Sequence, residues 1–322
     1  MPVAAARDPA AIAAAPVISR RKRSVRGTDR VNVLLLIEQA LNGVQLGVML
    51  FLMAAGLTLV FGIMNLINLT HGSLYMLGAF FAATLQQWTG SFLIALVLAI
   101  PATALVGLAI EVVTLRTLYT RDHLDQVLCT FGLILFLNEL TRIVWGPLPL
   151  RATLPAALAG TVEILPGVAY PSFRLAIIAT GLLVALFLWL LIAKTRIGML
   201  IRAGASDRMM IGALGVDIKS LCTLVFALGA ALAGLAGMMA GPLLAVQVGM
   251  GDGVLILTLV VIVIGGIGSI RGAFVAALLI GVIDTFGRVM LPPALGQMCI
   301  YVLMAGILFW RPRGLFPAAH HG

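Results

Sequence analysis

The sequence predicts an all-α, polytopic membrane protein: a transmembrane helical bundle of about eight to ten spans with broken or re-entrant segments. Of its 322 residues, 61% are hydrophobic and 10% are charged, which leaves too little polar side chain to cover the surface of a soluble domain. Runs such as 175–193 and 221–240 carry no charge and can cross roughly 30 Å of hydrocarbon. A β-barrel is excluded, because its strands alternate polar and apolar residues.

The first 31 residues are rich in Ala, Pro and Arg and include SRRKRSVR at 19–26. A signal peptide would combine a short apolar core with a small-residue cleavage site, whereas the apolar stretch that follows, 31–64, is far too long. The arginines Arg20 and Arg21 also lack the apolar residues expected soon after a twin-arginine signal. We therefore expect a cytoplasmic, disordered basic tail over 1–31 and a transmembrane domain over 32–317.

Apolar segments then follow one another along the chain. If each crosses the membrane, the N-terminus, 116–126, 194–219 and the C-terminal Arg311–Arg313 fall on one side, together with most Lys and Arg. The positive-inside rule makes that side cytoplasmic, so both termini are expected there, and the proline-rich segment 146–174 becomes the largest outer loop. The segments are 33–50, 53–69, 72–89, 92–115, 127–145, 175–193, 220–242, 253–267, 272–290 and 296–310.

Two stretches interrupt apolar runs with polar or glycine-rich sequence. The first, 65–72, reads NLINLTHG, and the second, 265–272, reads GGIGSIRG. In lipid, unpaired backbone is tolerated only where protein or a water-filled cavity covers it. The two stretches resemble a weak internal repeat, and repeated broken helices are common in transporters. We expect broken or re-entrant helices here; two tight turns between ordinary spans are the alternative.

Motifs for enzymatic chemistry are missing from the sequence. His71 is the only histidine in an apolar context, and there is no HExxH, GxSxG or paired-carboxylate motif. The cysteines Cys129, Cys222 and Cys299 are too far apart to suggest a metal site or a disulfide framework. No GxxxxGK[ST] pattern occurs either, so the chain is not a P-loop ATPase. We expect no catalytic residues and no metal site.

An ion-coupled carrier is the alternative that uses ionisable residues inside the bilayer. The candidates are Glu38, Glu111, Glu139 and Asp284. Glu139 has Arg142 three residues on, and Asp284 has Arg288 four residues on, spacings that favour ion pairs on one helix face. Structural pairing is the preferred interpretation of these charges, and a carrier that uses them is the alternative.

The segment 194–219, KTRIGMLIRAGASDRMMIGALGVDIK, is the polar, basic exception in this apolar chain. It predicts a short amphipathic helix with turns, in which basic residues alternate with exposed methionines. Such a helix suits docking into a groove of another protein; a helix lying on anionic lipid is the alternative. The net charge of +9 does not indicate a nucleic-acid partner, because the basic residues lie mainly between apolar runs.

Three motifs together resemble the permease subunit of branched-chain amino acid ABC importers, most closely the first of the two paired permeases. They are GLTLVFGIMNLINLTHGSLYMLGAF (56–80), IRAGASDRMMIGALGVD (201–217) and IGGIGSIRGA (264–273), and the resemblance runs from about residue 38 to Pro317. It implies an inner-membrane permease domain that works with a second homologous permease, two ATP-binding-cassette ATPases and a periplasmic solute-binding protein. The ATPases would bind ATP, so the chain itself needs no cofactor.

The resemblance also implies roles for particular residues. Those expected to couple to the ATPase are Arg202, Ala205, Ser206, Asp207, Arg208, Gly212 and Gly215. Those expected along the translocation path are Asn65, Asn68, His71, Gly72, Gly265, Gly266 and Gly268. Many relatives have Glu at the position of Ser206, some have Pro at Arg271, and some have an acidic residue at Ser73. The expected solutes are Leu, Ile and Val; urea or another small organic solute, or an ion-coupled secondary transporter, is the alternative.

Overall fold

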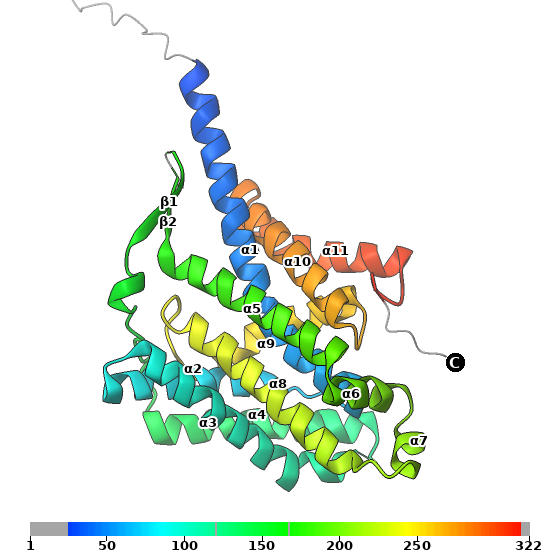
Figure 1. The fold of residues 1–322 in the computed structure, drawn as a ribbon. Coiled ribbons are helices and arrows are strands. Elements are labelled where there is room, and N and C mark those ends of the chain that lie inside the picture. The colour runs from blue at the N-terminus through cyan, green and yellow to red at the C-terminus, as the bar shows by residue number, and fades with distance from the viewer. Residues whose placement is uncertain (1–24, 120, 167, 317–322) are drawn as a thin grey trace, which may run out of the picture.

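A computed structural model describes residues 25–119, 121–166 and 168–316 of the chain, which form one helical bundle (Figure 1). The elements are α1 (Val25–Met64), α2 (His71–Thr89), α3 (Phe92–Val113), η1 (Leu115–Leu118), α4 (His123–Trp145), η2 (Ala156–Leu158), β1 (Thr161–Leu165), β2 (Val168–Pro171), α5 (Ser172–Lys194), α6 (Arg196–Ser206), α7 (Arg208–Ala213), α8 (Ile218–Ala240), α9 (Met250–Gly265), α10 (Ile270–Met290) and α11 (Pro293–Trp310).

Six of the described helices are long and apolar enough to cross a membrane: α1 over Leu34–Met64, α3, α4, α5, α8 and α10. Two more apolar helices are shorter, α9 and the Leu295–Trp310 part of α11, and α2 adds 19 residues. The predicted polytopic helical bundle is confirmed. A small antiparallel hairpin, β1 with β2, interrupts the otherwise helical chain within the loop expected at 146–174.

Helix α1 corrects the sequence prediction. The apolar segments 33–50 and 53–69 were expected to be two spans, but one helix of 40 residues runs from Val25 to Met64. The residues around 50–53 are all apolar and helix-forming, so nothing there ends the helix. At 1.5 Å per residue the helix is about 60 Å long, twice the hydrocarbon thickness. It also begins inside the segment 1–31 that was expected to be disordered; residues 1–24 lie outside the described part.

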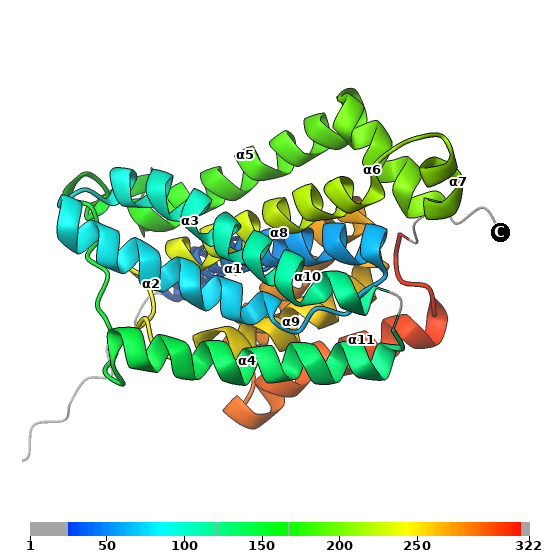
Figure 2. The ribbon, with the colours of Figure 1, turned by 90° about the horizontal axis from the view of Figure 1, so that it is seen from below.

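The two ends of the bundle differ, and α1 connects them (Figure 2). At one end, here called the hairpin end, the Asn42 side chain of α1 accepts hydrogen bonds from the Tyr170 hydroxyl (3.1 Å) and the Arg174 guanidinium. At the other, here called the coupling end, Gly62 and Asn65 lie beside α6 and α7. The C-terminal segment 311–316 reaches the coupling end, where Leu315 N–H donates to Ile264.

In this arrangement the first and last described segments of the chain lie at opposite ends of the bundle, whereas both termini were expected on one side. Because the two predicted N-terminal spans are one helix, one crossing is lost between the start of the chain and the segment 194–219. The first turns of α1 therefore lie at the hairpin end, opposite the C-terminal segment and α6.

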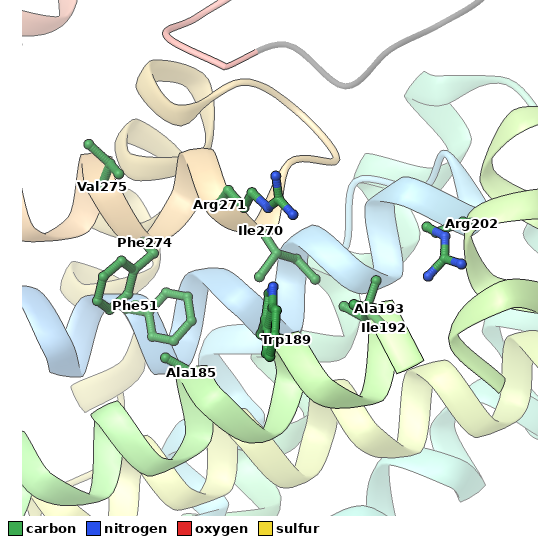
Figure 3. A pocket seen from close by; sticks show the side chains of 10 residues that line it. All are labelled: Phe51, Ala185, Trp189, Ile192, Ala193, Arg202, Ile270, Arg271, Phe274 and Val275. Atoms are coloured by element: carbon green, nitrogen blue, oxygen red, sulfur yellow. The ribbon is translucent and has the colours of Figure 1, made fainter. Parts of the chain in front are cut away.

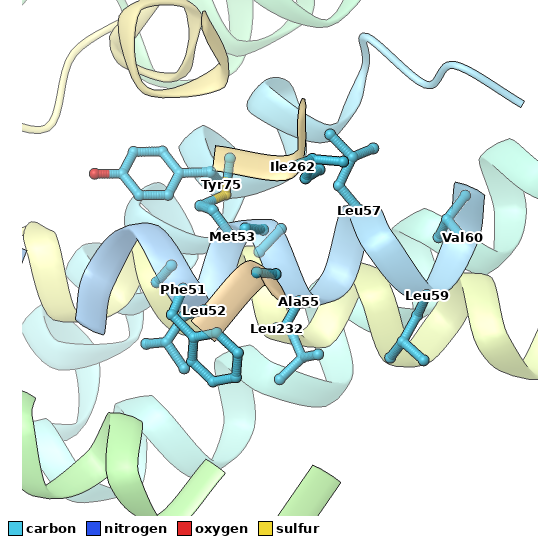
Figure 4. Close-up of a cluster of buried hydrophobic side chains, with 14 of the residues drawn as sticks. Phe51, Leu52, Met53, Ala55, Leu57, Leu59, Val60, Tyr75, Leu232 and Ile262 are labelled. Carbon is cyan, nitrogen blue, oxygen red and sulfur yellow. The ribbon is translucent and has the colours of Figure 1, made fainter. Parts of the chain in front are cut away.

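The core is built around the second half of α1, which packs against α10, α8, α5 and α9. Its side chains from Leu50 to Met64 lie in one large buried apolar cluster, which also contains Tyr75 of α2, Leu232 of α8 and Ile262 of α9 (Figure 4). Phe51 meets Phe274 of α10 edge to face, with ring centroids 5.0 Å apart. Such pairs add about 0.5–1.5 kcal/mol beyond the buried area.

Glycines set the spacing of α2, α3 and α8. A Cβ at Gly78 of α2 would overlap the backbone of Gly234 of α8, and one at Gly237 would overlap the carbonyl of Tyr75. On the same face of α8, one turn before Gly234, Gly107 of α3 packs directly on Ala230. Helices inside lipid gain no hydrophobic free energy by meeting each other, so close backbone contact of this kind is what holds them together.

Gly78→Leu should therefore destabilise the protein, because the side chain has no space between α2 and α8; overpacking of this kind costs about 1–3 kcal/mol or more. We expect a lower unfolding temperature and less monodisperse protein on size exclusion in detergent. Gly132→Leu is the matched control, since a Cβ at Gly132 of α4 would have no other atom within 4 Å, and this variant should unfold like the wild type. Equal unfolding temperatures for the two variants would contradict the close packing.

Candidate coupling surface and helix breaks

The basic segment 194–219 folds as two short helices joined by caps. The Thr195 hydroxyl accepts from Gly198 N–H (3.0 Å) at the start of α6, and Asp207 accepts from Met210 N–H (3.0 Å) at the start of α7. Asp217 caps α8 by accepting from the N–H groups of Lys219 and Ser220 (3.0 and 3.3 Å). Each cap satisfies donors that the first turn leaves free. The Ser220 hydrogen bonds hold the pKa of Asp217 below its usual range, so the cap stays ionised.

The two helices project from the coupling end and expose apolar side chains. Met209 is 87% exposed, Leu214 77% and Met210 64%, while Ile211 between them is buried. Leu214 lies in the turn that follows α7, next to Gly215, whose positive φ of 87° favours glycine. An apolar tip next to charged residues is typical of a surface that a partner protein covers.

A pocket of about 450 Å³ joins this surface to α1 and to the α9–α10 turn. Its lining includes Asn65, Ala205, Ser206, Arg208 and Gly268. Residues expected to couple to an ATPase are thus placed beside two of those expected on the path. Asn65 has a positive φ of 50°, and one guanidinium nitrogen of Arg208 is buried without a hydrogen-bond partner among the described residues. Arg208 is therefore directed inward, and the more exposed residues of α7 face outward.

The first predicted break is a re-entrant segment. After α1 ends at Met64, residues 65–70 run back along it, so that the His71 imidazole Nε2 lies 3.2 Å from the carbonyl oxygen of Met53. Met53 precedes the end of α1 by 11 residues, about 16 Å along the helix axis. Helix α2 therefore begins well inside the bundle. The Thr70 hydroxyl donates to the carbonyl oxygen of Thr130 in α4 (3.2 Å), which fixes the segment from the other side.

Most of the polar groups of this break are enclosed by protein. Asn68 and His71 have no exposed surface, and the Asn68 side chain accepts from Thr70 N–H (3.1 Å). The backbone at Gly72 packs directly on Gly251, the second residue of α9. Asn65 alone of the path residues in this break lines one of the pockets described here.

The second predicted break is a turn at the coupling end, the alternative left open by the sequence. Gly266 and Gly268 both have positive φ values, 101° and 79°, and Ser269 caps α10 by accepting from Gly272 N–H (3.1 Å). The C-terminal segment closes over it, since Phe316 N–H donates to the carbonyl of Gly265 (3.0 Å).

The second helix that begins inside the bundle is α9, and it begins before the stretch 265–272 that was expected to form the break. Helix α9 begins at Met250, and its Gly251 meets Gly72 at the start of α2. The preceding segment 241–249 returns from the end of α8 and forms an isolated bridge between Val246 and Leu150. The glycines at 249, 251 and 253 could have indicated this helix start. They lie at or just before the beginning of the predicted apolar segment 253–267, and they were not recognised from the sequence.

The buried carboxylate Glu111 belongs to a structural cluster. It has no exposed surface and accepts hydrogen bonds from the Tyr119 hydroxyl (2.6 Å), Thr223 (2.8 Å) and Arg116 (3.3 Å). The cluster connects the end of α3 to the start of α8 through η1. Burial and the hydrogen bond to Glu111 raise the pKa of Tyr119, so this hydroxyl remains a donor.

The two helix-face pairs expected from spacing are also present. Arg142 lies 2.8 Å from Glu139 with both side chains more than half exposed, and Arg288 lies 2.8 Å from the buried Asp284. Among the described residues, no group of three or more His, Cys, Asp or Glu side chains is placed to hold a metal ion.

The family comparison and the most similar proteins found agree on one family. The branched-chain amino acid transport system permease component family matches residues 39–308. The high-affinity branched-chain amino acid transport system permease protein BraD of Pseudomonas aeruginosa is 31% identical over 87% of this chain and 95% of its own length. The corresponding permease protein LivH of Escherichia coli is 29% identical over 87% of this chain and 94% of its length. No solved structure was found to match the chain.

Glu111→Ala should destabilise the protein by about 1–3 kcal/mol, because it leaves three buried or half-buried donors without their acceptor. Glu139→Ala removes the acid of an exposed pair and should cost less than about 1 kcal/mol. Thermal unfolding in detergent separates the two. If Glu111→Ala unfolds no earlier than Glu139→Ala, the Glu111 cluster does not connect α3 to α8 as described.

Proposed function

The chain belongs to the family of permease components of branched-chain amino acid transport systems, and on this premise we propose that it translocates leucine, isoleucine and valine as one subunit of an ATP-driven importer. It is a multi-pass membrane permease and not an enzyme, and it works with other transporter subunits. We propose as those subunits a second homologous permease, two ATP-binding-cassette ATPases and a periplasmic binding protein that delivers the solute.

The proposal places the coupling end in the cytoplasm of a bacterial inner membrane. Helices α6 and α7 would then meet the ATPase, with the apolar tip at Met209, Met210 and Leu214 in a groove of that subunit. The C-terminal segment shares this side, and the hairpin end faces the periplasm together with the first turns of α1.

The pocket lined by Asn65, Ala205, Ser206, Arg208 and Gly268 is the observation that best supports the coupling mechanism. A rigid-body movement of α6 and α7, imposed by closure of the ATPases, would press on the end of α1 and on the α9–α10 turn at once. The other expected coupling residues, Arg202, Gly212 and Gly215, would orient and flank the moving helices. In this proposal a cap links each short helix to its neighbour, so the movement passes through the segment as a whole.

The re-entrant segment and the start of α9 would then respond to that movement. Asn68, His71 and Gly72 lie where α2 begins, and Gly265 and Gly266 lie where α9 ends. Since Gly72 meets Gly251, a shift of either helix start changes the position of the other. Alternating access would follow from rocking of these half-crossing helices, with the polar groups of Asn65, Asn68 and His71 exposed to the solute in one of the two states.

Uptake of radiolabelled leucine by cells that express the complete system tests the proposed energy source. We expect uptake to persist when a protonophore collapses the proton gradient while ATP is maintained, and to vanish when the ATPase subunits carry an inactive Walker A lysine. Uptake that stops with the protonophore and survives loss of the ATPase would identify an ion-coupled carrier instead. Competition by excess valine but not urea distinguishes the proposed solutes from the alternative ones.

Asp207→Arg combined with Arg208→Glu should abolish uptake and co-purification of the ATPase, with normal membrane insertion. The exchange reverses the charges at the start of α7 and leaves net charge unchanged. Met209→Asp with Leu214→Asp should have the same effect, because it places two charges in the proposed apolar contact.

Asp207→Asn is the control for helix structure, since Asn also caps helices and should keep the hydrogen bond to Met210 N–H. We expect this variant to retain most of the uptake and to bind the ATPase. Wild-type uptake by both charged double variants would show that α7 is not the contact.

A further inference from the structure

A groove of about 590 Å³ lies between α5 and α10, and no residue of α7 lines it (Figure 3). Phe51 of α1 forms its floor, with Phe274 packed against it edge to face. Trp189 and Ala185 of α5 form one wall. The lining is apolar except for two arginines, Arg202 of α6 and Arg271 of α10.

The two arginines lie at the end of the groove nearest the coupling end. Arg271 is the second residue of α10, directly after the α9–α10 turn, and Arg202 is in α6, which follows α5 without a loop. Both side chains are exposed, and within the described part of the chain neither makes an ion pair or a hydrogen bond. Two cations from different helices therefore border one cavity without an anion between them.

The depth of the groove corresponds to one leaflet of a bilayer. Trp189 precedes the end of α5 by five residues, about 8 Å along the helix, and Phe51 precedes the end of α1 by 13 residues, about 20 Å. Half of the hydrocarbon core is about 15 Å thick. The arginines thus lie at headgroup level, Trp189 at the interfacial level that Trp prefers, and the phenylalanines at the level of acyl chains.

We propose that this groove binds one anionic phospholipid, with its phosphate between Arg202 and Arg271 and one acyl chain along Trp189, Phe51 and Phe274. Paired guanidinium groups suit a phosphate, because each offers several donors to its oxygens. Basic pockets between transmembrane helices on the cytoplasmic side are typical sites for anionic headgroups.

A lipid fits the groove better than a helix of a second permease. The neighbouring face of α5 carries Leu182, Leu183 and Leu186, all about half exposed or more, so the groove opens onto a surface suited to hydrocarbon. A transmembrane helix that filled it would have to bring an acidic group to the two arginines, whereas an anionic lipid supplies both the charge and the apolar chain.

The bound phosphate would also connect the coupling segment to the rest of the bundle. Arg202 belongs to α6, and Arg271 to the first turn of α10, two elements that the proposed function moves relative to each other. This consequence rests on that function; binding of the lipid does not, and it can be measured in the absence of transport.

The test is native mass spectrometry of the purified permease in its complex, delipidated and then titrated with phosphatidylglycerol. We expect Arg202→Gln with Arg271→Gln to weaken binding by roughly 30-fold, from about fivefold for each basic residue near a lipid surface. Arg313→Gln is the matched control, because Arg313 is also exposed at the coupling end but does not line the groove. It should bind as the wild type does. Equal binding by all three proteins would overturn the proposal.

Ala185→Trp tests the apolar half of the site, since it fills the groove and keeps both arginines. We expect it to lose phosphatidylglycerol, and we expect inorganic phosphate in excess not to displace the lipid from the wild type. If Ala185→Trp still binds phosphatidylglycerol as tightly as the wild type, the acyl chain does not occupy the groove and the proposed lipid site is refuted. Equal binding of phosphatidylcholine would refute it as well, as would a disulfide between Ala185→Cys and a cysteine placed on the second permease.

Folding of the variants is checked in the same samples. Arg202→Lys with Arg271→Lys keeps both charges and should bind within about fivefold of the wild type. If this variant and the Gln variant have the same unfolding temperature but differ in lipid binding, the difference belongs to the site and not to the fold.

Discussion

The structure depends on one constraint: a peptide group that leaves a helix inside lipid must find its hydrogen-bond partner in the protein. The segment after α1 shows how the chain meets it. Where residues 65–70 leave helical geometry, the Asn65 N–H donates to the Phe61 carbonyl and the Thr70 N–H donates to the Asn68 side chain. Side chains then attach the segment to two helices, the His71 imidazole to the Met53 carbonyl of α1 and the Thr70 hydroxyl to the Thr130 carbonyl of α4. A helix can therefore begin inside the bundle only because α1, α4 and α9 surround its start.

Close packing of glycines follows from the same environment. Where α2 begins, Gly72 touches Gly251 of α9, and one turn and a half later Gly78 touches Gly234 of α8. With no side chain at these positions the helices approach until their backbones meet, so dispersion forces replace the hydrophobic effect as the source of stability. The starts of α2 and α9 are thus held together by backbone contact, with no side chains interlocked between Gly72 and Gly251.

Sequence patterns predicted the helical, membrane-spanning nature of the fold better than the route of the chain from one helix to the next. Charge-free runs of about twenty residues identified α5 and α8, and the long apolar segments between basic loops identified the other spans. The caps at Asp207 and Asp217 were not predicted. The division of α1 into two spans was wrong because length was the only argument for it, and no residue near 50–53 stops a helix. The direction of Arg202 could not be predicted either, since it depends on how α6 lies against α5 and α10.

The location of the exposed arginine and the apolar tip on opposite sides of one short segment has a mechanical consequence. Arg202 of α6 lines the groove beside α10, while Met209 of α7 and Leu214, which follows α7, are exposed. A force applied at the tip reaches α6 through the Asp207 cap and must move Arg202 with it. Whatever anion holds Arg202 to Arg271 then sets the resistance to that movement. If the ATPase binds at this tip as proposed, the contact surface and the groove act on the same short segment, and substitutions at either one should alter the coupling between ATP hydrolysis and transport.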